Sequence, residues 1–196
     1  MKPLVIFAIL ALFPYSLLFG QESVNAVEKT KMPLLYLGVG LGVNEYGIGL
    51  DLEIPIIRKL SIKGNLGIGG WGWKAGGSLN FYPKNVMDKS EFSIGYSKAS
   101  GIENVVRSLW LDPDEKEYPV KLAFNPVETI NLVYTINVKI KKASKAGFSL
   151  GYALPITKNP YSVKSNVDIS RNSEQYLKIY QPGGLIIGMK IALGAL

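Results

Sequence analysis

Large apolar residues alternate with small or polar residues along most of the chain after Leu34. In the first such stretch, aliphatic side chains occupy every second position from 35 to 41, and Tyr36 and three glycines fill the positions between 36 and 42. A period of two predicts a β-strand whose two faces meet different surroundings. The alternation predicts eight strands, over residues 35–42, 47–54, 60–68, 71–81, 92–96, 130–140, 147–154 and 185–194.

Alternation alone does not say what the apolar face touches. A soluble barrel or sandwich turns that face inward, whereas a membrane barrel turns it toward lipid. The other face of this chain is rich in Gly and Ser instead of long charged residues, and small side chains suit a narrow barrel interior. The longest connections, over residues 99–127 and 155–184, fall on one side, which is typical of the long outer loops of membrane barrels.

Strand length and aromatic placement also favour a membrane. Strands of about ten residues match the span that a tilted strand needs to cross a bilayer. Amphipathic rings favour the lipid interface. The aromatic residues near the predicted strand ends are Tyr46, Trp71, Trp73, Phe81, Tyr82, Tyr96 and Tyr152. We therefore expect an all-β fold, an antiparallel up-and-down transmembrane β-barrel of about eight strands.

The chain begins with the features of a secretory signal peptide. Met1 and Lys2 precede an apolar run over residues 3–19, and polarity rises abruptly at Gln21. The run is short for a spanning helix and Pro14 interrupts it. We expect residues 1–20 to be a signal peptide, with cleavage after Gly20 or as late as residue 26. Residues 21–33 would form a short periplasmic segment and residues 34–196 the barrel.

On this pattern and export signal, the chain resembles the small eight-stranded outer-membrane β-barrel proteins of Gram-negative bacteria. The resemblance covers nearly all of the mature chain. It implies an outer-membrane location, contact with outer-membrane lipids, and passage through the export and barrel-assembly machinery. Such barrels often finish with an aromatic residue that the assembly machinery recognises, whereas this chain ends with Leu193, Gly194, Ala195 and Leu196.

The composition excludes several classes of metal site and catalytic mechanism. The chain has no histidine and no cysteine, which excludes disulfides, thiolate metal sites and a lipid-bearing cysteine. It also excludes serine hydrolases and most hydrolytic metal sites, which depend on imidazole near neutral pH. We expect no enzymatic activity, no metal and no cofactor.

The net charge of +7 does not indicate nucleic-acid binding, because the lysines are scattered. Contact with anionic lipid head groups fits that distribution better. Gly67, Gly69 and Gly72 have the spacing of a dinucleotide-binding fingerprint, but they lie between two predicted strands where that motif requires a helix. They predict a tight hairpin instead.

Six charged residues fall on the small-or-polar face, so they would point into the lumen of a closed barrel. They are Asp51, Glu53, Lys63, Lys74, Lys139 and Lys190. A tight turn after Ile56 would place Asp51 or Glu53 opposite Lys63, close enough for an ion pair. The simpler interpretation is a salt-bridged plug that fills the interior. The alternative is a narrow charged pathway or a small-ligand pocket.

Two connections carry further candidates. Trp110 could contact a partner or act as an interface anchor. The carboxylate cluster that follows it could bind calcium, but it lacks the spacing of a dedicated calcium loop, so a solvated acidic loop is the simpler interpretation. The cluster consists of Asp112, Asp114, Glu115 and Glu117. Lys139, Lys141, Lys142 and Lys145 surround the turn before the seventh predicted strand, on the periplasmic side. They would meet lipid head groups or cell-wall anions, or simply solubilise the turn.

These features predict a non-enzymatic outer-membrane barrel with a structural or binding role through its long extracellular loops, whose ligand the sequence does not identify. A narrow pore or small-solute channel is one alternative. Others are a soluble periplasmic or secreted barrel that binds an apolar ligand, and a lipid-modifying barrel enzyme, which would have to work without histidine.

Overall fold

The computed structural model describes residues 32–111, 116–140, 143–165 and 167–195. The predicted signal peptide, and residues 21–31 of the predicted periplasmic segment, lie outside the described residues.

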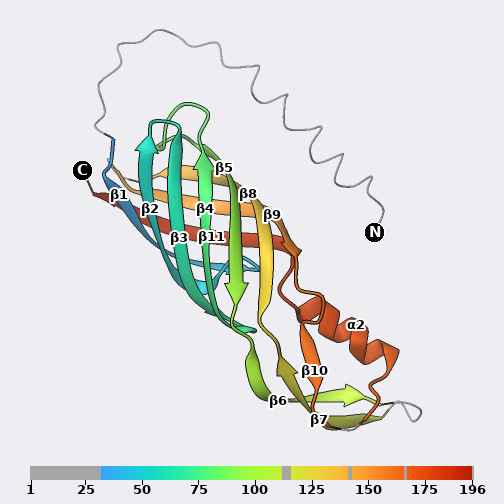
Figure 1. Ribbon diagram of the computed structural model, residues 1–196. Coiled ribbons are helices and arrows are strands. Elements are labelled where there is room, and N and C mark those ends of the chain that lie inside the picture. The colour runs from blue at the N-terminus through green and yellow to red at the C-terminus, as the bar shows by residue number, and fades with distance from the viewer. Residues whose placement is uncertain (1–31, 112–115, 141–142, 166, 196) are drawn as a thin grey trace, which may run out of the picture. The chain divides into compact units, whose positions relative to one another are not determined.

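Eight antiparallel strands close into a barrel, which confirms the predicted strand number and architecture (Figure 1). They are β1 (Leu35–Val43), β2 (Gly47–Ile57), β3 (Leu60–Gly69), β4 (Gly72–Phe81), β5 (Ser90–Ala99), β8 (Val127–Lys139), β9 (Lys145–Pro155) and β11 (Gly184–Ala195). Each strand pairs with the barrel strands before and after it in the chain, and β11 pairs with β1 from Leu35↔Ala195 to Val43↔Ile187. Closure leaves the wall without an unpaired edge.

The large apolar side chains of the wall face outward. Val39, at the centre of β1, is 56% exposed, and the aliphatic residues of the other barrel strands are similarly exposed. The alternate positions point inward and are buried; they hold tyrosines, hydroxyl residues, amides and charged groups, in addition to glycines. The barrel wall thus has an apolar outer face and a mostly polar inner face.

The connections differ strongly between the two ends of the barrel. One end, here called the turn end, carries the β2–β3, β4–β5 and β8–β9 connections and both the start of β1 and the end of β11. The other, the extension end, carries the short β1–β2 and β3–β4 turns and both long connections.

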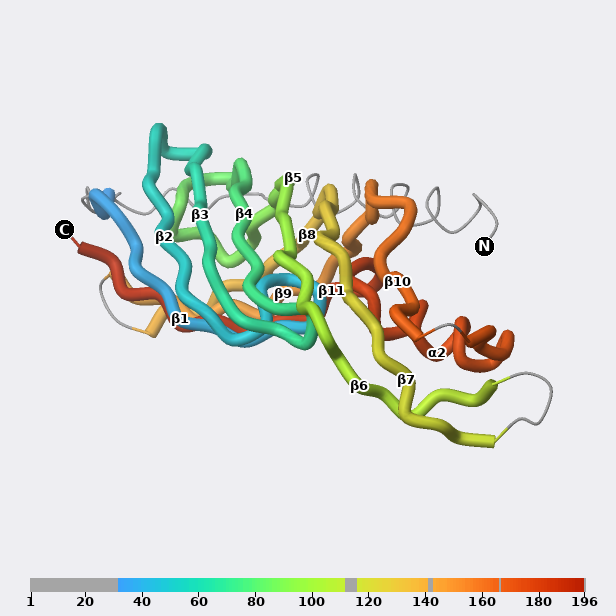
Figure 2. The backbone as a smooth tube through the Cα atoms, turned by 60° about the horizontal axis from the view of Figure 1, so that its bottom comes forward, coloured from blue at the N-terminus to red at the C-terminus, as the bar shows by residue number. Residues whose placement is uncertain are grey.

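The long connections fold into an extension that the sequence pattern did not predict. It contains β6 (Ile102–Trp110), β7 (Glu117–Phe124) and β10 (Tyr161–Val163), which form a sheet of order β10-β7-β6, and the helix α2 (Arg171–Tyr180). Figure 2 shows β6 and β7 running on from β5 and β8 beyond the rest of the barrel wall. No helix within the described ranges is long and apolar enough to cross a membrane.

A hydrophobic core joins the extension to the barrel. Its buried members are Trp71, Ala99, Leu109, Val120, Leu122, Phe124, Val127 and Leu177. Trp71, in the β3–β4 turn, stacks on Phe124 with ring centroids 3.9 Å apart, and its Nε1 donates to the carbonyl of Asn125 at 2.9 Å. The extension is therefore a packed structure fixed to the rim and not a pair of separate loops.

Candidate functional site

The barrel interior holds equal numbers of buried acidic and basic side chains among the described residues. The carboxylates are Glu45, Asp51, Glu53 and Glu91, and the ammonium groups are Lys63, Lys74, Lys145 and Lys190. Alternation brings them inward from six different strands and one turn. Because buried charges are costly unless they are paired, the balance of four against four favours a network that neutralises itself.

Glu91, from β5, is the hub of this network and is fully buried. Its carboxylate lies 3.3 Å from the Nζ of Lys190, 3.7 Å from that of Lys145 and 3.9 Å from that of Lys63. The side-chain amide of Asn137 donates a further hydrogen bond to it at 3.2 Å. One carboxylate thus ties together β3, β5, β8, β9 and β11.

Glu53 forms a second centre nearer the turn end. Its carboxylate lies 3.0 Å from the Nζ of Lys145, and it accepts hydrogen bonds from Ser61 at 2.7 Å and from the hydroxyl of Tyr82. The ammonium of Lys145 also lies 4.4 Å from the ring centroid of Tyr36. Burial and the nearby charge of Glu91 hold the pKa of Tyr82 well above its usual value, so its hydroxyl stays a neutral donor.

The extension end has a smaller polar group. Lys74 Nζ donates to the backbone carbonyl of Asn44 at 2.6 Å, and the Tyr46 hydroxyl donates to Asp51 at 3.4 Å. Burial, and after it the charge of Glu45, raises the pKa of Tyr46 far above its usual value. Lys63 reaches Glu45 at 3.8 Å, which links this group to the hub.

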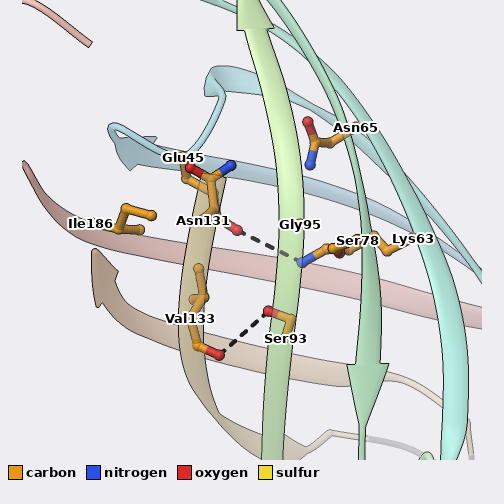
Figure 3. A pocket seen from close by; sticks show the side chains of 9 residues that line it. All are labelled: Glu45, Lys63, Asn65, Ser78, Ser93, Gly95, Asn131, Val133 and Ile186. Carbon is orange, nitrogen blue, oxygen red and sulfur yellow. Dashed lines mark hydrogen bonds and ion pairs between the residues drawn. The ribbon is translucent and has the colours of Figure 1, made fainter. Parts of the chain in front are cut away.

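The interior has little free space. At the turn end, the β4–β5 connection packs Val86 and Met87 against Tyr36, Tyr82 and Ala192. Nearer the extension end lies a polar pocket of ≈ 20 Å³, enough for about one water molecule. Figure 3 shows its lining, which includes the Glu45–Lys63 pair, Asn131 and Ser93.

The structure places five of the six predicted lumen charges in the interior: Asp51, Glu53, Lys63, Lys74 and Lys190. The prediction that Lys139 points into the lumen is wrong, because its side chain is exposed. It ends β8 at the turn end, where its side chain reaches water, and its cross-strand partner Lys145 takes the buried position instead.

The predicted ion pair between Lys63 and Asp51 or Glu53 is replaced by other ion pairs. Glu53 lies directly opposite Lys63 in the β2–β3 register, yet the ammonium of Lys63 pairs with Glu45 and Glu91, while Glu53 pairs with Lys145. Lys145, which the sequence placed at the surface of a turn, is 4% exposed. Lys141 and Lys142 lie outside the described residues.

Sequence reasoning missed Glu45, Glu91 and Lys145 as interior groups. The signal for two of them was present: Glu91 shares the inward phase of Ser93 and Gly95, and Lys145 that of Gly147 and Ser149. Glu45 carries no such signal, because it lies in a turn.

The three glycines with dinucleotide-binding spacing form a hairpin. Gly69 ends β3 and pairs with Gly72, which begins β4 with a φ of +92° that favours glycine. No helix follows them, so the phosphate-binding geometry of that motif is not built here.

In the extension, the predicted contact residues are only partly described. Asp112, Asp114 and Glu115 lie outside the described residues, whereas Glu117 is exposed at the start of β7. Trp110 ends β6 and begins an aromatic row, with its ring centroid 6.4 Å from that of Tyr176, which is 4.6 Å from that of Tyr180. The row runs along α2 and was not predicted.

Within the described part of the chain, no three acidic side chains are grouped so that they could hold a metal ion. The chain matches no protein-family model. Comparison with curated proteins finds no match either.

Proposed function

We propose that this protein spans a bacterial outer membrane as a sealed eight-stranded barrel and works as a non-enzymatic anchor that presents the extension at the cell surface. The observation that carries the proposal is the outward apolar face of the barrel wall. It includes Val39, Leu50, Leu66, Ile94, Leu132, Leu150 and Met189, which are 38% to 59% exposed. In water, contiguous apolar surface on this scale would promote association, whereas lipid would cover it.

The packed interior supports an anchor over the alternatives. A small-solute channel needs an open path, and the buried ion pairs together with the packing of Val86, from the β4–β5 connection, favour a closed lumen. A soluble carrier of an apolar ligand needs apolar side chains inside, but the described interior is mostly polar. A barrel enzyme needs a free reactive group, while the buried carboxylates and ammonium groups of the hub satisfy one another.

A pair of matched substitutions tests the membrane assignment. Val39→Arg places a charge at the centre of β1, and Val106→Arg places one on β6 in the extension; the two valines are 56% and 54% exposed. In a lipid-spanning barrel, Val39→Arg lowers folding stability by about 2–4 kcal/mol, as measured for arginine at the bilayer midplane. Val106→Arg, outside the barrel wall, leaves the stability nearly unchanged.

The measurement is urea unfolding in lipid vesicles, followed by the heat-modifiable migration of the folded barrel on a gel. Cell fractionation gives an independent readout, with the protein expected in the outer-membrane fraction. Equal tolerance of both arginines, together with recovery of the protein in the soluble periplasm, would refute the proposal. Current steps through the unmodified protein in planar bilayers would replace the sealed anchor with the channel.

A further inference from the structure

The helix α2 carries an exposed apolar stripe that the extension core does not use. Leu177 is buried in that core, but Ile179, two positions later, is 78% exposed. Residues two apart lie about 200° apart around a helix, so Ile179 points away from the core. Tyr176, about 60° from Ile179 around the helix, is 37% exposed, and Tyr180, about 100° from Ile179 at the end of the helix, is 61% exposed.

Hydrogen bonds fix where each end of α2 lies. At its start, the Ser170 N–H donates to the carbonyl of Trp110 at 2.9 Å, and the Trp110 N–H donates to the Ser173 hydroxyl at 2.7 Å. Trp110 is the last residue of β6, at the tip of the extension. The helix therefore begins far from the barrel rim.

At its other end, α2 returns to the rim. Asn44, in the β1–β2 turn, holds both backbone groups of Gly183: its Nδ2 donates to the Gly183 carbonyl at 2.8 Å, and its Oδ1 accepts from the Gly183 N–H at 3.1 Å. The next residue, Gly184, begins β11. The last turn of α2 thus lies within a few residues of the barrel wall (Figure 1).

The apolar surface continues from the wall toward this turn. Leu185, the first outward residue of β11, is 54% exposed, and Ile156, just after β9, is 52% exposed. Ile179 and Tyr180 precede Leu185 by six and five residues along the chain. Lys178, in the last turn, lies on the neighbouring stripe of the helix, where its cationic head suits lipid phosphates.

We propose that the last turn of α2 rests in the lipid head-group layer beside β11, with Ile179 inserted below it and the two tyrosine rings at the interface. Tyrosine favours this zone because one end of its ring system is apolar and the other polar. The helix then works as a strut that holds the extension at a fixed inclination to the membrane. This inference rests on the proposed membrane barrel.

The chain has no cysteine, so single labels test the inference directly. Ile179→Cys, Asn172→Cys and Ile187→Cys each carry a polarity-sensitive fluorophore in the full chain, reconstituted into vesicles with and without quencher-bearing lipids. Asn172 shares the outward side of α2 but lies seven residues earlier, roughly 10 Å along the helix. Ile187 is an outward residue of β11, 42% exposed, and reports on the barrel itself.

The inference expects strong quenching at 187, quenching at 179 at least twofold above that at 172, and a blue-shifted emission at 179. Quenching at 187 without quenching at 179 overturns the strut and leaves the membrane barrel intact. No quenching at 187 refutes the barrel and the strut together. A label at 179 that neither lipid quenchers nor iodide can reach is covered by protein, which also overturns the inference.

Discussion

The Nζ of Lys190 lies 3.3 Å from both carboxylate oxygens of Glu91, although 99 residues separate the two in the chain. Their strands, β11 and β5, are separated in the wall by β9 and β8, so the pair spans the lumen. Glu91→Gln would leave three lysines around a neutral side chain. We expect it to lower the free energy of unfolding by about 3–5 kcal/mol, the range for breaking a buried ion pair.

The control for this substitution is an ion pair on the outside of the barrel, between β5 and its neighbour β8. Lys98 and Glu128 lie 3.0 Å apart with both side chains exposed, and Glu128→Gln should change the urea midpoint little. The double variant Glu91→Gln with Lys190→Met should recover part of the loss, because it removes one unpaired ammonium. Equal midpoints for the two single variants would contradict the hub.

Two glycines of β3 make a second matched test. A Cβ at Gly67 would clash with the backbone carbonyl of Tyr46, whereas a Cβ at Gly69 would have its nearest neighbour 3.9 Å away. Gly67→Ala must displace the β1–β2 turn, and we expect a loss of roughly 1–3 kcal/mol in unfolding experiments. Gly69→Ala should be tolerated. A larger stability loss for Gly69→Ala than for Gly67→Ala would mean that the β1–β2 turn does not approach β3 as described.

The contact between Trp71 and Phe124 should control the order of the extension without controlling the barrel. Phe124→Ala removes the stacked ring from the core and is expected to open the extension locally. Limited proteolysis should then cut within residues 100–126 while the barrel keeps its heat-modifiable migration. Trp73→Ala, at a ring that faces outward and is 58% exposed, should leave the proteolysis pattern unchanged.

Alkaline pH should destabilise the barrel through its buried tyrosines. The pKa values of Tyr46 and Tyr82 lie above their ordinary value of 10.0, so above that pH the unfolded chain releases protons that the folded chain keeps. The stabilisation that the two buried tyrosines give the folded chain is complete below pH 10. Above pH 10 the free energy of unfolding falls by about 1.4 kcal/mol per pH unit for each tyrosine. Tyr46→Phe should reduce this slope in urea unfolding; an unchanged slope would contradict the burial of its hydroxyl.

The barrel was predictable because alternate residues of a strand face opposite sides of the wall, and the residue types differ between the two sides. Leu35 to Gly42 already assigns every side chain of β1 to the outer or inner face, and the same period places the other seven barrel strands. The ion pairs were not predictable in the same way. Cross-strand register places Glu53 opposite Lys63, but long side chains in a narrow lumen reach strands several positions around the wall.

The extension escaped prediction for a different reason. In β6, a register shift between Ile102 and Val105 and the positive φ of Asn104 interrupt the alternation, so the segment lacks a sustained period. In α2, only Ser173 and Leu177 are buried, and tertiary packing stabilises the short helix more than its own sequence does. Neither element carries a pattern strong enough to be found alone.

The balance of interior charge has a consequence for biogenesis. Of the buried ionisable groups, the part of the chain up to residue 99 supplies all four carboxylates but only two lysines, and the part from residue 127 supplies the other two lysines. Neither half can neutralise itself, so a nascent sheet of five strands retains surplus negative charge until Lys145 and Lys190 arrive with β9 and β11. Barrel closure should therefore be cooperative, because only the final strands supply the lysines that neutralise the interior.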